Sequence, residues 1–139
     1  MPGEGRGRVI YWDTSALLSC LILDSQSTDA RSRLAANAYH LVSSLAFAEV
    51  HAVLARLARK ARKRGDAEAA RAAFGRGPWR WLEIGPSRGA SEALAERHPL
   101  RGADLWHLAT AVTMRKRLPE LELLTYDRAL REAASAEGL

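Results

Sequence analysis

Residues 9–17 read Val9-Ile10-Tyr11-Trp12-Asp13-Thr14-Ser15-Ala16-Leu17. The first four are apolar β-formers in an unbroken run, which predicts a buried strand. The run ends at Asp13, and Thr14 and Ser15 are predicted to cap a helix that begins at Ala16 and continues to Leu23. A strand that passes directly into a helix is typical of an α/β fold, and here it places an acidic side chain at the carboxyl end of the strand.

The same alternation continues along the chain. Further strands are predicted at 39–42, 79–84 and 121–125, and further helices at 28–37, 44 to a stop at Gly65, 66–74, 87–97, 103–118 and from Asp127 onward. The helix after Ser44 is predicted to bury a single stripe formed by Phe47, Val50, Val53, Leu54, Leu57, Ala58 and Ala61. Residues 66–74 are expected to pair with it as a helical hairpin. The pattern predicts a mainly parallel sheet covered by helices on both faces.

Length and composition indicate one globular domain. With 139 residues, 47% of them apolar, the chain is predicted to form a single domain (1–139) behind a loose, Gly-rich lead-in at residues 1–8. The longest apolar stretch, 17–23, is too short to span a bilayer, and the N-terminus lacks a signal-peptide pattern. Cys20 is the only cysteine, so we expect a buried, inert thiol and no multi-cysteine zinc site. These features predict a cytoplasmic protein without a membrane partner.

The chain is basic, with a formal net charge of +5. The segment Arg56–Arg64 carries six cations and no acid. One interpretation is a solvated helix end, where cations suit the C-terminal dipole. The other is a contact surface for a phosphate backbone or an acidic partner.

Four acidic residues stand out against this basic background: Asp13, Glu49, Asp104 and Asp127. Two follow predicted strands, and the other two lie in the first turns of predicted helices, so all four are expected at the carboxyl edge of the sheet. Singly, Asp13 and Asp127 could cap helices and Asp104 could favour a helix dipole. Glu49 lies too deep in its helix to cap it. Together, four unpaired carboxylates would repel one another, and Mg²⁺ or Mn²⁺ relieves that repulsion.

Other residues near the acids have competing interpretations. The hydroxyls of Thr14 and Ser15 are predicted to cap a helix, or alternatively to hold a metal-bound water or a phosphate. His107 lies three residues after Asp104, and packing or a hydrogen bond is the favoured role, because a hard metal prefers oxygen. Trp79, Trp81 and Trp106 are expected in the core or an interface, with base stacking as the alternative. The sequence contains no Walker loop and no Cys/His zinc spacing.

At these residues the chain resembles the PIN-domain nucleases, and within them the VapC-type toxins of toxin–antitoxin pairs. The matching stretches are Val9–Leu17, Ser43–Val50, Leu100–Ala111 and Leu123–Leu130. They occur in the family's order and span nearly the whole chain. The resemblance implies a three-layer α/β/α sandwich, an endoribonuclease that depends on Mg²⁺ or Mn²⁺, and inhibition by a small VapB-type antitoxin.

The resemblance carries over Asp13, Glu49, Asp104 and Asp127 as catalytic, metal-binding carboxylates, with Thr14 or Ser15 as supporting hydroxyls. It predicts an RNA substrate and leaves a homodimer open. Two other classes stay open as well. One is a phosphoryl-handling domain with Asp13 as nucleophile, although such a domain would want a second Asp beside Asp13. The other is an inert module that binds RNA or protein.

Overall fold

A four-stranded parallel sheet forms the centre of the protein; the computed structural model describes residues 7–139. The strands are ordered β3 (Trp79–Leu82), β2 (Ala38–Ser43), β1 (Arg8–Trp12) and β4 (Leu121–Leu124). In the central strand, Tyr11 pairs with Leu41 on one side and with Leu123 on the other. Because all strands run the same way, their carboxyl ends meet at one edge of the sheet.

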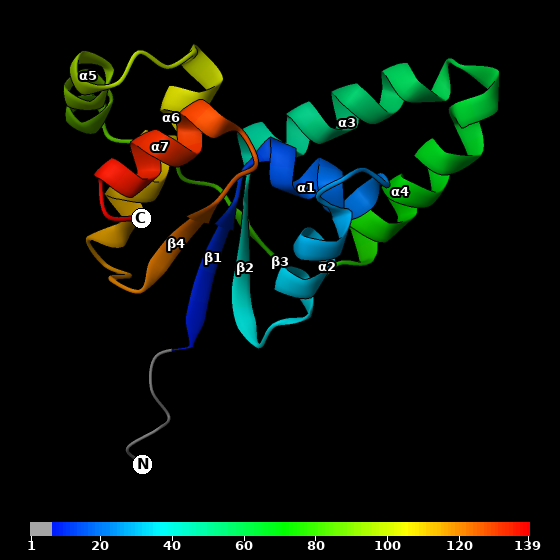
Figure 1. The fold of residues 1–139 in the computed structure, drawn as a ribbon, viewed down its shortest axis with the longest axis horizontal. Helices are drawn as coiled ribbons and strands as arrows, with labels where there is room; N and C mark the ends of the chain where they lie inside the picture. Colours follow the sequence, from blue (N-terminus) through cyan, green and yellow to red (C-terminus); the bar gives the residue numbers. More distant parts are fainter. Residues whose placement is uncertain (1–6) are drawn as a thin grey trace.

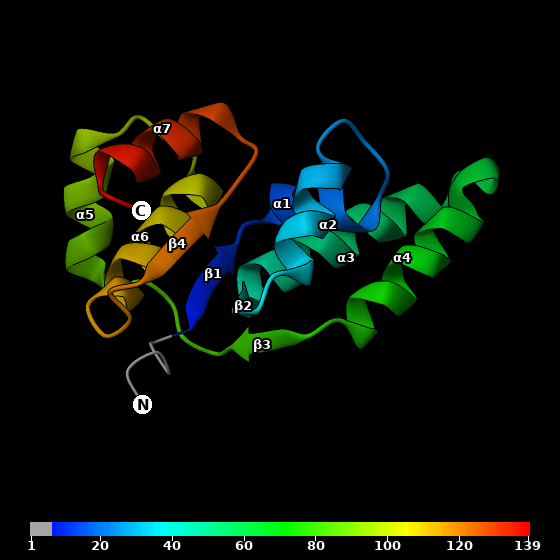
Figure 2. The same cartoon turned by 60° about the horizontal axis from the view of Figure 1, so that its bottom comes forward.

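Helices cover both faces of this sheet (Figures 1 and 2). One face carries α1 (Thr14–Leu21), α2 (Ser27–Ala35), α3 (Ser44–Ala58) and α4 (Arg64–Arg76), and the other carries α5 (Arg88–Arg97), α6 (Gly102–Arg115) and α7 (Arg128–Ala136). The predicted three-layer α/β/α sandwich is therefore confirmed. The predicted strands and helices all form, and their ends differ from the prediction by a few residues except in the helix after Ser44.

The sheet separates two hydrophobic cores, and β1 contributes to both. Ile10 and Trp12 pack with α1, α3 and α4, whereas Val9 and Tyr11 pack with α6 and α7. Successive side chains of a strand point to opposite faces, so an unbroken apolar run can fill two cores at once. Cys20 lies buried in the first core as a free thiol, as predicted, and burial raises its pKa.

The long helix predicted after Ser44 ends earlier than expected. We predicted a stop at Gly65, but α3 ends at Ala58, a short 3₁₀ turn follows at Ala61–Lys63, and Gly65 lies in the first turn of α4. The break comes where Lys60 adopts an extended backbone. The predicted hairpin does form: α3 and α4 pack together and extend away from the sheet (Figure 1), with the basic run at their tip.

Two other predictions need correction. In the predicted stripe of α3, Val50 and Leu54 are buried as expected, together with Ala46. Phe47 is 45% exposed, however, and Ala61 lies beyond the end of α3 and is exposed. The lead-in predicted at residues 1–8 lies mostly outside the described residues, and Arg8 already belongs to β1. Among the helices of residues 7–139, none combines the length and apolarity needed to cross a bilayer.

Candidate active site

Asp13 lies at the carboxyl end of β1 and is almost fully buried, with 2% of its surface exposed. It caps α1 itself, because its Oδ1 accepts a 2.8 Å hydrogen bond from the Ala16 amide. This corrects the prediction that Thr14 and Ser15 are the caps. The Ser15 hydroxyl instead donates to Oδ1 of Asp13 at 2.8 Å. Burial raises the pKa of Asp13 to about 6, although these hydrogen bonds oppose the shift.

The segment after β4 holds Asp13 from the other side. The Thr125 hydroxyl donates to Oδ2 of Asp13 at 2.6 Å, and it accepts from the Asp127 amide at 3.0 Å. Asp127 in turn caps α7, as predicted, by accepting from the Leu130 amide at 2.8 Å. These bonds tie the ends of two neighbouring strands together and place Asp127 close to Asp13.

Glu49 belongs to a second group of contacts, on α3. The Thr14 hydroxyl donates to Oε1 of Glu49 at 2.6 Å, and Nε2 of His107 lies 3.5 Å from the same oxygen. On its other side, His107 meets the Tyr11 hydroxyl, with 2.8 Å between that oxygen and Nδ1. Burial lowers the pKa of His107, and the nearby Glu49 opposes this shift. A neutral imidazole that accepts from Tyr11 and directs Nε2–H toward Glu49 fits these contacts.

Asp104 lies in the first turn of α6. Its pKa is raised, first by burial and then by the negative charges of Asp127 and Glu49. The charge of Asp104 likewise contributes to the raised pKa of Asp13. Asp104 is thus linked electrostatically to each of the other three predicted carboxylates: its own pKa responds to Asp127 and Glu49, and its charge acts on Asp13.

The donor atoms of the four carboxylates are of the kind that a hard divalent cation prefers. They offer only oxygen atoms, they repel one another, and Asp13 is buried with no cationic partner among its contacts. Within residues 7–139, however, no three His, Cys, Asp or Glu side chains already surround one ion position. The residues therefore fit an ion by the chemistry of their donor atoms, and the carboxylates would have to move to surround one.

Sequence reasoning missed three supporting residues: Tyr11, His107 as a partner of Glu49, and Thr125. Tyr11 looked like one more apolar member of a buried strand. His107 was assigned to packing or a hydrogen bond, and the structure confirms that role while adding the contact with Glu49. Thr125 carried only one signal, a hydroxyl residue at the end of a predicted strand beside Asp127.

Comparisons with known proteins address the family and the fold. The family model of the PIN domain matches residues 10–136. Among solved structures, the fold is similar to that in the crystal structure of VapBC2 from Rickettsia felis bound to a DNA fragment from their promoter. The TM-score is 0.55 at 14% identity, over 86% of this chain and 99% of that chain, so this likeness concerns the fold. A search of curated proteins found no match. Because the PIN-domain model spans nearly the whole chain, the protein belongs to the PIN-domain family.

Proposed function

We propose that this protein is an endoribonuclease that depends on Mg²⁺ or Mn²⁺ and hydrolyses RNA phosphodiester bonds. The observation that carries the proposal is the electrostatic link between the four carboxylates. Asp13 is buried, and its pKa is raised by burial and by the charge of Asp104. The pKa of Asp104 is raised in turn by burial and by the charges of Asp127 and Glu49. Membership of a family of nucleases supports hydrolysis as the reaction. The cation and the RNA substrate are part of the proposal.

The chain's own residues have distinct parts in this proposal. Asp13 and Asp104 would hold the ion directly, and Glu49 and Asp127 would complete its surroundings directly or through water. When bound, the ion lowers the pKa of a water and stabilises charge on a phosphoryl oxygen.

Two hydrogen-bonded supports orient the carboxylates. Ser15 and Thr125 keep the carboxylate of Asp13 in one orientation. Thr14 and His107 do the same for Glu49. A carboxylate whose direction is set by such partners loses less freedom when it binds an ion.

The alternative in which Asp13 acts as a phosphoryl-accepting nucleophile has less support. A phosphoryl-handling domain of this kind would want a second Asp beside Asp13, but Trp12 and Thr14 occupy the adjacent positions.

The partner is proposed to be a VapB-type antitoxin, and the protein to be the toxin of the pair. The motifs resemble those of VapC-type toxins, and a similar fold occurs in VapBC2 from Rickettsia felis, which was solved as a complex with promoter DNA. Cytoplasmic location and a homodimer stay predictions.

The test is cleavage of a single-stranded RNA by the purified protein. Cleavage is expected with Mg²⁺ or Mn²⁺, its loss in EDTA, and its return when the ion is restored. Asp104→Asn should abolish cleavage while circular dichroism shows a folded protein. Glu92→Gln, which removes an exposed carboxylate on α5, is the matched control and should cleave normally. Cleavage that persists in EDTA would contradict the proposal, and a wild type that binds RNA without cutting it would favour the inert module.

A further inference from the structure

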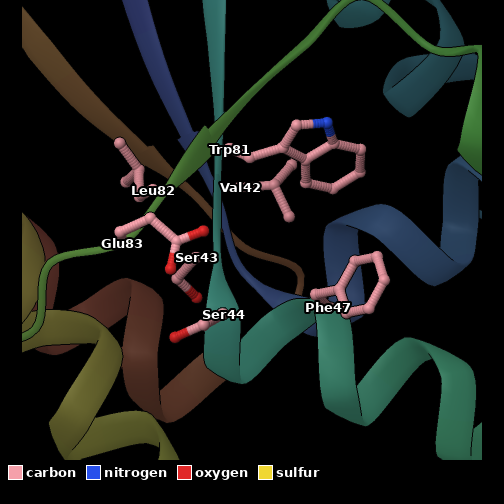
Figure 3. A pocket seen from close by; sticks show the side chains of 7 residues that line it. All are labelled: Val42, Ser43, Ser44, Phe47, Trp81, Leu82 and Glu83. Atoms are coloured by element: carbon pink, nitrogen blue, oxygen red, sulfur yellow. The ribbon is translucent and has the colours of Figure 1, made fainter.

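A cavity of about 250 Å³ lies beside the candidate active site, at the carboxyl ends of β2 and β3. Figure 3 shows two sides that differ in character. Phe47 and Trp81 form an aromatic side, Val42 lies behind them, and Ser44 and Glu83 present oxygen atoms on the opposite side, next to the buried Ser43. None of the four candidate carboxylates lines this cavity.

The aromatic side is held in place from within the fold, yet it faces solvent. Phe47 and Trp81 are each 45% exposed. Their ring centroids are 5.4 Å apart with the planes at 89°, and Phe74 of the core also lies 5.4 Å from Trp81 in an edge-on contact. These contacts fix the indole while leaving part of it uncovered. Aromatic surfaces of this kind stack on unpaired nucleobases, whatever the base.

The polar side of the cavity distinguishes a base from a phosphate. The Glu83 carboxylate would repel the RNA backbone, but it can accept hydrogen bonds from a base amino group. The hydroxyl of Ser44 can donate or accept. Adenine, cytosine and guanine carry exocyclic amino groups, whereas uracil has none. The cavity therefore favours an amino-bearing base, with the phosphates directed away from Glu83.

The cavity is also connected to the carboxylates through the fold. Ser43 caps α3, the helix that carries Glu49, by accepting from the Ala46 amide. Ser43 lies near enough to the Tyr11 hydroxyl to affect the pKa of Tyr11, and Tyr11 contacts His107. A strand of RNA that passes the carboxylates would thus find the aromatic cavity on the same edge of the sheet.

We propose that this cavity is a subsite for one unpaired, amino-bearing base of the RNA substrate. The base stacks on Trp81 and Phe47 and directs its amino group to Glu83. The inference rests on the proposed function for the identity of the ligand, but base binding here does not require that the protein cut RNA. The subsite would set which residue of a single strand lies next to the cleaved bond.

The test measures binding separately from cleavage. Fluorescence anisotropy is recorded with labelled oligoadenylate and oligouridylate of equal length, in EDTA. Trp81→Leu keeps an apolar side chain but removes the stacking surface, and it should weaken oligoadenylate binding roughly 5- to 100-fold. Tyr39→Leu removes an equally accessible aromatic ring, 50% exposed, from near the opposite end of β2, and it should leave binding unchanged.

A second variant tests the polar side. Wild type should prefer oligoadenylate, and Glu83→Gln should reduce that preference. Phe47→Leu provides an independent measurement if Trp81→Leu does not fold, and it should also weaken binding. Wild-type affinity in both aromatic variants, or equal binding of the two oligonucleotides by wild type, would overturn the subsite. A wild-type protein that shows the predicted base binding but does not cleave RNA would instead contradict the proposed nuclease function and leave the subsite standing.

Discussion

The hydroxyl of Thr125 donates a 2.6 Å hydrogen bond to Oδ2 of Asp13 across 112 positions of the sequence. The same oxygen of Thr125 accepts from the Asp127 amide. One side chain thus fixes the distance between two acidic residues that follow neighbouring strands. The acidic edge is therefore held together by hydroxyl groups even before any ion binds.

Replacing Thr125 with valine tests this relationship. The change keeps the shape of the buried side chain but removes the donor to Asp13 and the acceptor for the Asp127 amide. Because hydrogen bonds to charged groups contribute roughly 1.5–3 kcal/mol, the free energy of unfolding should fall by about that amount. Urea denaturation at neutral pH measures it. Thr125→Ser keeps the hydroxyl and should lose much less. If the valine variant is as stable as wild type, the hydrogen bond does not contribute to the free energy of unfolding.

The raised pKa of Asp13 predicts how stability depends on pH without metal. The pKa rises from 3.8 in the unfolded chain to about 6 in the folded protein, so the folded state holds its proton more tightly. The favourable contribution is present below pH 3.8 and is lost as the pH rises through about 6. The loss is on the order of 3 kcal/mol.

The measurement is the free energy of unfolding in EDTA across this pH range. Other carboxyl groups titrate there too, so Asp13→Asn serves as the reference. As the pH rises, the unfolding free energy of wild type should fall relative to that of Asp13→Asn. If the difference in unfolding free energy between wild type and Asp13→Asn stays constant between pH 3.8 and 6, the pKa of Asp13 is not raised by folding.

A variant of the basic run at the tip of the α3–α4 hairpin tests substrate contact separately from catalysis. If it contacts RNA, changing Arg59, Lys60, Lys63 and Arg64 to Gln should weaken RNA binding and flatten its dependence on salt. Each lost phosphate contact removes roughly 0.7 from the slope for a single strand. The cleavage rate at saturating RNA should change little, because these residues lie away from the carboxylates.

The same variant distinguishes an acidic protein partner from RNA. If the run instead binds an acidic antitoxin, RNA affinity should be retained and complex formation lost. Both bindings are measured across one salt series. Unchanged behaviour in both would leave the interpretation of a solvated helix end.

Much of this architecture could be predicted from the sequence, because its signals are local. The apolar run before Asp13 and the Asp127 cap each act within a few residues, and each occurs as expected. The carboxylates could be predicted to share one edge, since parallel strands place their carboxyl ends together.

The remaining features depend on contacts between distant segments. Phe47 follows the spacing of a buried stripe. It lies instead beside Trp81 of β3, a short strand at the edge of the sheet, where its ring stays partly exposed. The pairing of Thr14 with Glu49 also could not be predicted. It requires that Asp13 take over the cap of α1, which frees the hydroxyl of Thr14 to reach a different helix.

The central claim is that the four carboxylates form one divalent-cation site, and the melting temperature with and without Mn²⁺ tests it most directly. An ion that binds only the folded protein raises the melting temperature of wild type. Asp104→Asn should melt at the same or a higher temperature than wild type in EDTA, since one repelling charge is gone, and it should show no rise with Mn²⁺. An equal Mn²⁺-dependent rise in wild type and Asp104→Asn would place the ion elsewhere and contradict the account.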